Sequence, residues 1–186
     1  IKNIYKFSME HNWVAPCLSD GIGNRLFQFA CAKWYSEKYK KKLVFFLPRT
    51  KPTTHGDFEN MFKMFPNIPI IETESEWTEL NEKKYFVFEE LPNVEGDVVI
   101  NGSRQVYKYL ENLELKPVFP INKDNLQKYI KPNLFFIHLR LGDFRVLPHH
   151  QIDLARYYSE AIKLAPHDVN ILVFSDEPKS AKELFP

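Results

Sequence analysis

The stretch from Val14 to Leu47 constrains the fold more than any other part of the sequence, because its order is strand, glycine-containing turn, helix, strand. Apolar runs over 14–18 and 43–47 predict the two strands. Residues 24–39 carry apolar side chains at three- and four-residue spacing, which predicts an amphipathic helix. A strand–helix–strand connection within one sheet makes the strands parallel. The sequence therefore predicts an α/β fold built on parallel sheets.

A second strand–helix–strand series is predicted towards the C-terminus, with strands over 134–139 and 170–174 and an amphipathic helix over 152–164. Between the two series, residues 115–120 contain two prolines and are typical of a linker. We therefore expect two domains, residues 1–120 and 121–186.

The segment between the first series and the linker has a mixed pattern. Its periodicity predicts a helix over 57–64, a strand over 66–71, an acidic helix over 74–82, strands over 85–88 and 98–100, and a helix over 104–112. A short helix is also expected over 124–130. The lysine-rich run 38–42 is expected to be a solvated helix end, since lysines favour the negative pole of a helix.

The composition is that of a packed globular protein, with 44% hydrophobic and 15% aromatic residues among 186. The net charge of +1 argues against a dedicated nucleic-acid binder, which would carry a strong basic excess. The sequence contains no apolar run long enough to span a membrane and no signal-peptide pattern at its start. These features favour a cytoplasmic or membrane-associated protein.

Cys17 and Cys31 have apolar neighbours and are expected to be small buried residues, which suits a reducing compartment. A disulfide bond between Cys17 and Cys31 remains an alternative. Asn101-Gly102-Ser103 also matches an N-glycosylation acceptor, although we expect an interior loop there. A secretory origin, with the Golgi lumen as the compartment, therefore remains an alternative.

Charged residues lie at the carboxyl end of the predicted strand 134–139 and directly after it. Side chains of a strand alternate between faces, so Phe136, His138 and Arg140 should share one face. Ligands bind at the carboxyl edge of open α/β sheets, and the guanidinium of Arg140 suits a phosphate or carboxylate there. Gly142 would let a ligand approach the backbone, and Asp143 could accept hydrogen bonds. A simple Arg140–Asp143 ion pair, and a packing role for His138, are the structural alternatives.

A glycine turn precedes the first predicted helix, with Gly21 and Gly23 followed by Asn24 and Arg25. Such a turn presents backbone N–H groups at the positive end of a helix, which suits an anion or sugar hydroxyls. It is not the dinucleotide-binding fingerprint, because the third glycine position is Leu26. Taken alone, the turn is equally compatible with an ordinary tight connection.

Four segments together resemble the α-1,2-fucosyltransferase family, and they occur in the family's order. The segment 21–28 is similar to its G-x-G-N-x-L-F-Q opening, 102–109 to G-x-x-Q-x-x-K-Y, 138–143 to H-x-R-x-G-D, and 174–177 to F-S-D-D/E. Two departures stand out. Many relatives have a second arginine where this chain has Leu141, and family sequences continue well past the F-S-D strand.

The resemblance implies the two-domain glycosyltransferase B architecture, with Rossmann-like sheets and a second domain that is incomplete here. Residues 1–120 would then form the acceptor side, and 121–186 the first part of the nucleotide-sugar-binding domain. It further implies transfer of fucose from GDP-fucose to a glycan hydroxyl with inversion, without metal or a further cofactor. Exposed apolar surface near the C-terminus is expected, because two strand–helix units cannot cover both faces of a parallel sheet.

For the site, the resemblance makes Arg140 the residue that stabilises the leaving β-phosphate, with Asp143 and His138 as further catalytic candidates. Donor contacts are expected from seven residues: Gly21, Gly23, Asn24, Arg25, Gly142, Ser175 and Asp176. Inverting transfer also needs a general base. Asp143, Asp20, Asp57 and His138 all remain open for that role, and Ser175 and Asp176 could instead cap the last helix.

Other functions remain open at this stage. One is a nucleotide- or glycan-binding module without turnover, and another is a transferase that uses a different nucleotide sugar, such as a rhamnose donor. A metal site at His149-His150 is not favoured, because adjacent residues cannot easily point to one ion and no cysteine or carboxylate cluster accompanies them. The sequence gives no oligomeric state.

Overall fold

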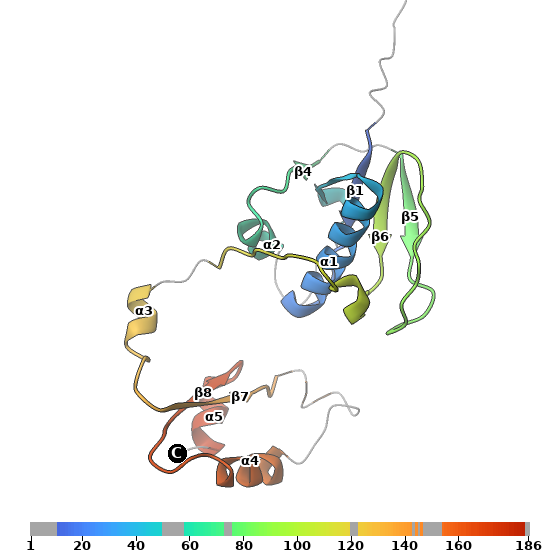
Figure 1. Ribbon diagram of the computed structural model, residues 1–186. Coiled ribbons are helices and arrows are strands. Elements are labelled where there is room, and N and C mark those ends of the chain that lie inside the picture. Colours follow the sequence, from blue (N-terminus) through green and yellow to red (C-terminus); the bar gives the residue numbers. More distant parts are fainter. Residues whose placement is uncertain are drawn as a thin grey trace, which may run out of the picture. The chain divides into compact units, whose positions relative to one another are not determined.

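Figure 1 shows the computed structural model, which describes residues 11–49, 58–72, 76–119, 123–142, 144, 146 and 154–184. Contacts divide the chain into two compact units, residues 1–120 (unit 1) and 121–186 (unit 2). The division falls at the proline-containing stretch, of which residues 115–119 form no helix or strand. The acceptor and donor roles of the two units stay predictions.

Unit 1 is built on a four-stranded parallel sheet with the strand order β2-β1-β6-β5. Its strands are β1 (Trp13–Pro16), β2 (Lys42–Leu43), β5 (Trp77–Asn81) and β6 (Asp97–Asn101). Beyond β2 the backbone N–H of Val44 still donates to the Val14 carbonyl, at 2.9 Å. The chain then enters β3 (Phe45–Phe46), which pairs in parallel with β4 (Ile70–Ile71). The predicted parallel α/β fold is therefore confirmed.

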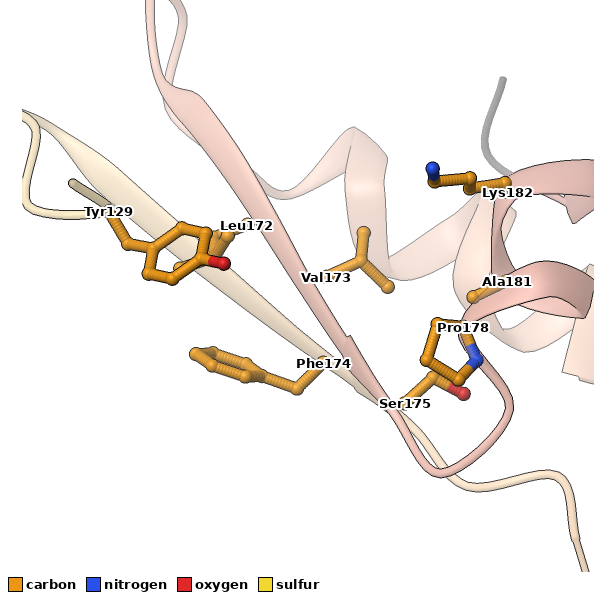
Figure 2. Close-up of a pocket in the computed structure, with 8 residues that line it drawn as sticks. All are labelled: Tyr129, Leu172, Val173, Phe174, Ser175, Pro178, Ala181 and Lys182. Atoms are coloured by element: carbon orange, nitrogen blue, oxygen red, sulfur yellow. The ribbon is translucent and has the colours of Figure 1, made fainter. Parts of the chain in front are cut away.

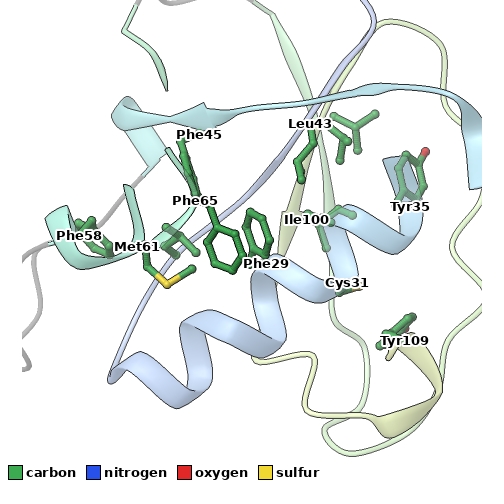
Figure 3. Close-up of a cluster of buried hydrophobic side chains, with 14 of the residues drawn as sticks. Phe29, Cys31, Tyr35, Leu43, Phe45, Phe58, Met61, Phe65, Ile100 and Tyr109 are labelled. Atoms are coloured by element: carbon green, nitrogen blue, oxygen red, sulfur yellow. The ribbon is translucent and has the colours of Figure 1, made fainter. Parts of the chain in front are cut away.

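Helix α1 (Ile22–Tyr39) lies against the sheet of unit 1 (Figure 1). It ends at Lys40, whose left-handed backbone (φ 53°) lets its N–H reach the Ser36 carbonyl. The apolar side of α1 meets the strands and α2 (Glu59–Met64) in one buried core. Phe29 is at its centre, with its ring 4.0 Å from that of Phe65. Figure 3 shows this core, to which the following side chains also belong: Tyr35, Leu43, Phe45, Phe58, Met61, Ile100 and Tyr109.

Three predictions for the middle of unit 1 were wrong. The acidic helix expected over 74–82 is instead strand β5 at 77–81, because pairing along the whole of β6 overrides the local helix preference. The strand expected over 85–88 is an exposed turn, in which Phe86 has a positive φ of 59°. The helix expected over 104–112 is reduced to a 3₁₀ turn, η2 (Tyr107–Tyr109), and Arg104 before it has a positive φ of 52°. A 3₁₀ turn η1 (Leu47–Arg49) also follows β3.

The lysine run at the end of α1 is only partly solvated. Lys38 pairs with Glu90 at the surface. Lys41, by contrast, is only 6% exposed and its Nζ donates to Asn12 Oδ1 and, at 2.7 Å, to the Gly96 carbonyl. Burial lowers the pKa of Lys41, although the Asp97 and Glu95 carboxylates oppose that shift. Lys41 therefore ties three segments of unit 1 together.

In the described part of unit 2, two parallel strands, β7 (Leu134–Leu139) and β8 (Asn170–Ser175), pair over their whole length. The same part of the chain contains the helices α3 (Lys123–Gln127), α4 (Leu154–Lys163) and α5 (Pro178–Leu184). This arrangement confirms the second strand–helix–strand series.

One face of the two-stranded sheet is buried and the other is exposed. Leu139 and Leu141 pack with Ala181 of α5 in a small core, against which Tyr158 of α4 and Val173 also pack. On the opposite face Phe136 and Phe174 are 58% and 51% exposed, with their rings stacked at 5.7 Å. The predicted exposed apolar surface is therefore present, whereas incompleteness of the second domain stays a prediction.

Both cysteines are buried and unbridged, with Cys17 4% and Cys31 0% exposed. Their predicted role as small buried residues is confirmed. Among the helices that the structure describes, none combines the length and apolar character needed to span a membrane.

Candidate functional site

The carboxyl ends of three unit 1 strands lie together at one edge of the sheet. Pro16 of β1 and Leu80 of β5 both pair with Ile100 of β6, so the three strands end at the same level. The loops that follow them are residues 17–21, the turn from Glu82, and residues 102–106. Two of these loops carry motifs that the sequence singled out.

The loop between β1 and α1 is fixed by a buried amide. Gln28 of α1 is 1% exposed, and its Oε1 accepts the Ser19 N–H while its Nε2 donates to Ser19 Oγ, both at 2.9 Å. Ser19 Oγ donates in turn to the Asp20 carboxylate at 2.9 Å. Asp20 itself is exposed and has a positive φ of 60°. One of the candidate bases is thus held at a defined position on the carboxyl edge.

Gly21 and Gly23 leave open space at the start of α1. A Cβ atom at either position would meet nothing within 4 Å, and neither glycine has a positive φ. The N-cap residue, Gly21, has no side chain with which to cap the helix. The backbone therefore does not demand glycine here, and the open space is compatible with the predicted approach of a ligand to the N–H groups.

The two residues after Gly23 have different environments. Asn24 is half-buried, and its Oδ1 accepts a hydrogen bond from Gln105 Nε2 at 2.6 Å. Arg25 is only 1% exposed, and its guanidinium lies 4.4 Å from the centre of the Phe58 ring. Arg25 thus packs inside unit 1, and its predicted contact with the donor stays a prediction.

The loop after β6 is fixed by the carboxylate of Glu82. Glu82 Oε2 accepts the Ser103 N–H at 2.8 Å and its hydroxyl at 3.0 Å, and Oε1 accepts the Arg104 N–H at 3.2 Å. Gly102 between the strand and these contacts has φ 117°, and a Cβ there would lie 2.3 Å from Glu82 Cβ. Only glycine fits this position without movement of the loop.

In unit 2, the structure brings together two motifs that lie 35 residues apart. Asp176, which follows β8, accepts the Leu141 N–H through Oδ1 at 2.9 Å. Its Oδ2 lies 2.8 Å from the position that a Cβ of residue 142 would take. The sequence suggested that Gly142 admits a ligand to the backbone. In the structure the space beside Gly142 is occupied by the Asp176 carboxylate, so Asp176 positions the loop that follows Arg140.

Arg140 and His138 have the exposure that strand alternation predicts. Both are exposed and belong to the alternating set that includes Phe136, whereas Ile137 and Leu139 are buried. The Arg140 guanidinium lies 4.7 Å from the centre of the Phe144 ring, a distance at which cation–π attraction operates. The packing role weighed for His138 is therefore wrong for its side chain.

The backbone of His138 is nevertheless engaged. Its carbonyl accepts the Tyr158 hydroxyl of α4 at 2.5 Å, and burial raises the pKa of Tyr158.

Ser175, another predicted donor contact, accepts the Glu177 N–H through Oγ at 3.0 Å just before α5 begins. This contact forms a turn before α5 and does not reach an N–H group of the helix itself, so both the donor contact and the capping role of Ser175 stay predictions. The predicted Asp57, Asp143 and His149-His150 lie outside the described residues.

A cavity of about 360 Å³ lies beside β8 and α5 in unit 2 (Figure 2). Its walls are mainly apolar, and they are formed by Tyr129, Leu172, Val173, Phe174, Ser175, Pro178, Ala181 and Lys182. Side chains of both sheet faces line it, as expected for a hollow along the outer edge of a strand. Of the predicted site residues that the structure describes, Ser175 alone lines this cavity. Over the described part of the chain, no three His, Cys, Asp or Glu side chains cluster as metal ligands would.

Comparisons with known proteins agree with this fold. No protein-family model matches the chain. The chain is 26% identical to the O-antigen biosynthesis glycosyltransferase WbnK of Escherichia coli over 227 aligned residues, covering 91% of this chain and 74% of the relative. The solved fucosyltransferase NodZ from Bradyrhizobium is similar with a TM-score of 0.50 and 12% identity, over 95% of this chain and 77% of NodZ.

A second NodZ structure, an α-1,6-fucosyltransferase co-crystallised with GDP, has the same TM-score of 0.50 at 15% identity, over 95% of this chain and 76% of NodZ. Identities this low show the fold alone. The chain thus has an α/β fold with parallel sheets similar to that of NodZ.

Sequence reasoning missed how the site residues are connected. Glu82 was placed in a helix that does not form, so its contacts to the 103–104 backbone could not be anticipated. Gln105 was recognised only as part of a motif. Its pairing with Asn24 depends on the spatial order of β1 and β6, which local periodicity does not contain.

Proposed function

We propose that this protein is a glycosyltransferase that transfers fucose from GDP-fucose to a carbohydrate hydroxyl, with inversion at the anomeric carbon. The observation that carries the proposal is the similarity to the glycosyltransferase WbnK, which extends over 91% of the chain. The fold shared with NodZ, which was crystallised with GDP, adds support for a nucleotide-sugar donor. A two-domain glycosyltransferase B architecture, with acceptor and donor on different units, is part of the proposal.

In this proposal Arg140 stabilises the departing nucleotide. Departure of a nucleoside diphosphate places negative charge on the β-phosphate, and a guanidinium can offer two parallel hydrogen bonds to it. Arg140 is exposed directly after the carboxyl end of β7, and the Asp176 contact to Leu141 holds the backbone next to it. This arrangement supports a phosphate site at Arg140.

An inverting transfer also requires a base for the acceptor proton. Among the described candidates, Asp20 and His138 are both exposed. Asp20 is held by Ser19 on the unit 1 edge, which we propose to be the acceptor side. We therefore favour Asp20 over His138, and Asp57 and Asp143 remain candidates from the sequence.

Calorimetric titration of the chain with GDP, and with UDP as the control nucleotide, tests this proposal. We expect GDP to bind selectively and Arg140→Ala to weaken binding by about 1.5–3 kcal/mol, the range for hydrogen bonds to a charged group. Arg156→Ala, which removes another exposed arginine of unit 2, is the matched control and should leave the affinity unchanged. Equal GDP affinity of folded Arg140→Ala and wild type would rule out this donor site.

One observation favours a second candidate, a nucleotide-binding module without turnover. Leu141 stands where many members of the resembled family have a second arginine, and here it is 2% exposed in the small core of unit 2. A buried leucine can give no charge to a phosphate. Incubation with GDP-fucose and a panel of galactosides separates the two candidates, since only a transferase releases GDP and a fucosylated product. A parallel panel of UDP and TDP sugars tests another donor, such as a rhamnose nucleotide.

A further inference from the structure

The contact between Gln105 and Asn24 joins the two unit 1 loops that carry sequence motifs. Gln105 follows β6 and Asn24 lies in the first turn of α1, 81 residues earlier in the chain. Gln105 Nε2 donates to Asn24 Oδ1 at 2.6 Å. This contact lies at the carboxyl edge of the sheet, where ligands bind in open α/β folds.

Gln105 is presented by a segment with little freedom to move. The preceding residue, Arg104, is 1% exposed and donates to the Asn101 carbonyl at 3.1 Å, the Leu80 carbonyl at 2.8 Å and the Glu89 carboxylate at 2.9 Å. Glu82 holds the backbone N–H of Arg104 as well. A side chain carried on such a fully bonded loop can orient a partner at little entropic cost.

The hydrogen bond fixes which way the Asn24 amide faces. Because Oδ1 accepts from Gln105, the two N–H groups of Asn24 Nδ2 are directed away from that bond. Within the described parts of the chain, neither Asn24 Nδ2 nor Gln105 Oε1 has a protein partner. The pair therefore combines donors from Asn24 with an acceptor from Gln105.

Such a combination suits a sugar hydroxyl better than a phosphate. A hydroxyl both donates and accepts, so it can satisfy Gln105 Oε1 and Asn24 Nδ2 together. A phosphate oxygen only accepts, and it would face the amide oxygen of Gln105 unfavourably. The exposed Asp20 carboxylate on the same edge further disfavours an anion.

We propose that Gln105 is a positioning residue for the acceptor, which gives Asn24 an acceptor contact in place of the donor contact that the family resemblance implied. It holds the Asn24 amide so that Nδ2 donates to a hydroxyl of the acceptor sugar, and its own Oε1 accepts from a hydroxyl of that sugar. This inference rests on the proposed transferase function and adds to it a specificity device on unit 1.

Kinetics of fucosyl transfer by the full chain test the inference, with acceptor and donor varied separately. In Gln105→Glu the introduced carboxylate cannot donate to Asn24 Oδ1, so the Asn24 amide must rotate and present its oxygen to the acceptor. We expect kcat/KM for the acceptor to fall about tenfold or more, as for a lost hydrogen bond, with the KM for GDP-fucose unchanged. The loss should shrink below about pH 5, where the introduced carboxyl group becomes protonated and can donate again.

A double-mutant cycle with Asn24→Ala shows whether Gln105 acts through Asn24. Gln105→Ala should lower acceptor kcat/KM in the wild-type background and have much less effect when position 24 is already alanine. Gln127→Glu, which changes an exposed glutamine of unit 2, is the matched control and should leave all parameters unchanged. Thermal melting of each variant checks that unit 1 remains folded.

The outcomes separate the two proposals. No transfer by the wild-type chain with any donor overturns the proposed function and this inference with it. Normal transfer by wild type together with normal acceptor kinetics in folded Gln105→Glu overturns only the inference. Equal effects of Gln105→Ala with and without the Asn24 side chain, or a change confined to donor KM, would also overturn the positioning role.

Discussion

Units 1 and 2 both contain a strand–helix–strand series, but the side chains of the sheet are more completely buried in unit 1 than in unit 2. In unit 1 the sheet and α1 enclose a large core around Phe29, and buried Gln28 and Arg104 fix the loops at the carboxyl edge. In unit 2 one sheet face packs on a small core while the other exposes Phe136 and Phe174. The proposed acceptor edge therefore rests on a buried polar network, whereas at the proposed phosphate site the exposed Asp176 carboxylate holds the backbone next to Arg140.

Matched phenylalanine truncations test this difference most strongly. Phe29→Ala should destabilise unit 1 by about 3–5 kcal/mol, because it empties the centre of a packed core. Phe136→Ala, in the exposed face of unit 2, should cost under about 1 kcal/mol, because the wild-type ring is little buried. Urea unfolding followed by circular dichroism and tryptophan fluorescence measures both; all three tryptophans belong to unit 1. Similar costs at the two positions would refute the contrast between the units.

A pair of glycines tests the loop network of unit 1. Gly102→Ala should cost about 3 kcal/mol, because the substitution combines a positive φ with a clash against Glu82 Cβ. Gly96→Ala is the control: its φ is 72° but a Cβ there meets nothing within 4 Å, so only about 1 kcal/mol of backbone strain is expected. Urea unfolding detected by tryptophan fluorescence measures the loss of stability in both variants. Equal losses for the two variants would mean that Glu82 gives way and does not fix the loop.

The Asp176 carboxylate can be tested at the amide that it binds. Asp176→Ala leaves the N–H of buried Leu141 without its acceptor, so we expect unit 2 to lose about 2 kcal/mol. Asp176→Asn retains an acceptor oxygen and should lose less. Hydrogen exchange of the Leu141 amide, followed by NMR, reports the local change directly. Unaltered exchange in Asp176→Ala would show that the contact does not hold this loop.

The smallest expected effect is a pH dependence of unit 1. Burial raises the pKa of the Cys31 thiol from 9.0 to about 12, with Arg104 opposing and Glu82 and Glu89 reinforcing the shift. The thiol ionises more easily in the unfolded chain, so its contribution to stability is complete below pH 9 and is lost as the pH rises towards about 12.

Comparison of wild type with Cys31→Ala removes the thiol together with its effect on Tyr109, whose pKa is raised by burial and by the Cys31 charge, whereas the burial that raises the pKa of Tyr35 is common to both proteins. The free-energy advantage of wild type should shrink by about 1 kcal/mol between pH 9 and pH 10. Urea unfolding at a series of pH values measures it. A difference that stays constant over that range would contradict the expected shift.

The parts of the fold that were predictable from sequence are those in which local pattern and tertiary environment agree. β7 has the bounds that its apolar run predicts, and α1 follows its amphipathic spacing. The pattern fails at 77–81, where an acidic segment becomes a strand because β6 supplies a partner along its whole length. It fails again at Lys41, whose charge is satisfied by Asn12 and Gly96, residues distant in sequence.

The candidate site shows the same limit. The order of the motifs along the chain identifies the segments around Asn24, Arg140 and Asp176 as site candidates. Local sequence does not show which side chains in these segments are in contact. The open space at Gly21 and Gly23 and the filled space at Gly142 look identical in sequence, because all three are glycines next to polar residues. Only the positions of Asp176 and of the helix start distinguish them.

The contact between Gly142 and Asp176 also limits how the sequence can change over evolutionary time. A larger residue at 142 meets the carboxylate at 2.8 Å, and a shorter residue at 176 leaves the Leu141 amide without an acceptor. The two positions are therefore expected to covary, with substitution at either tolerated mainly after a compensating change at the other. Gly142 and Asp176, which belong to two separate motifs, should therefore be conserved together or change together.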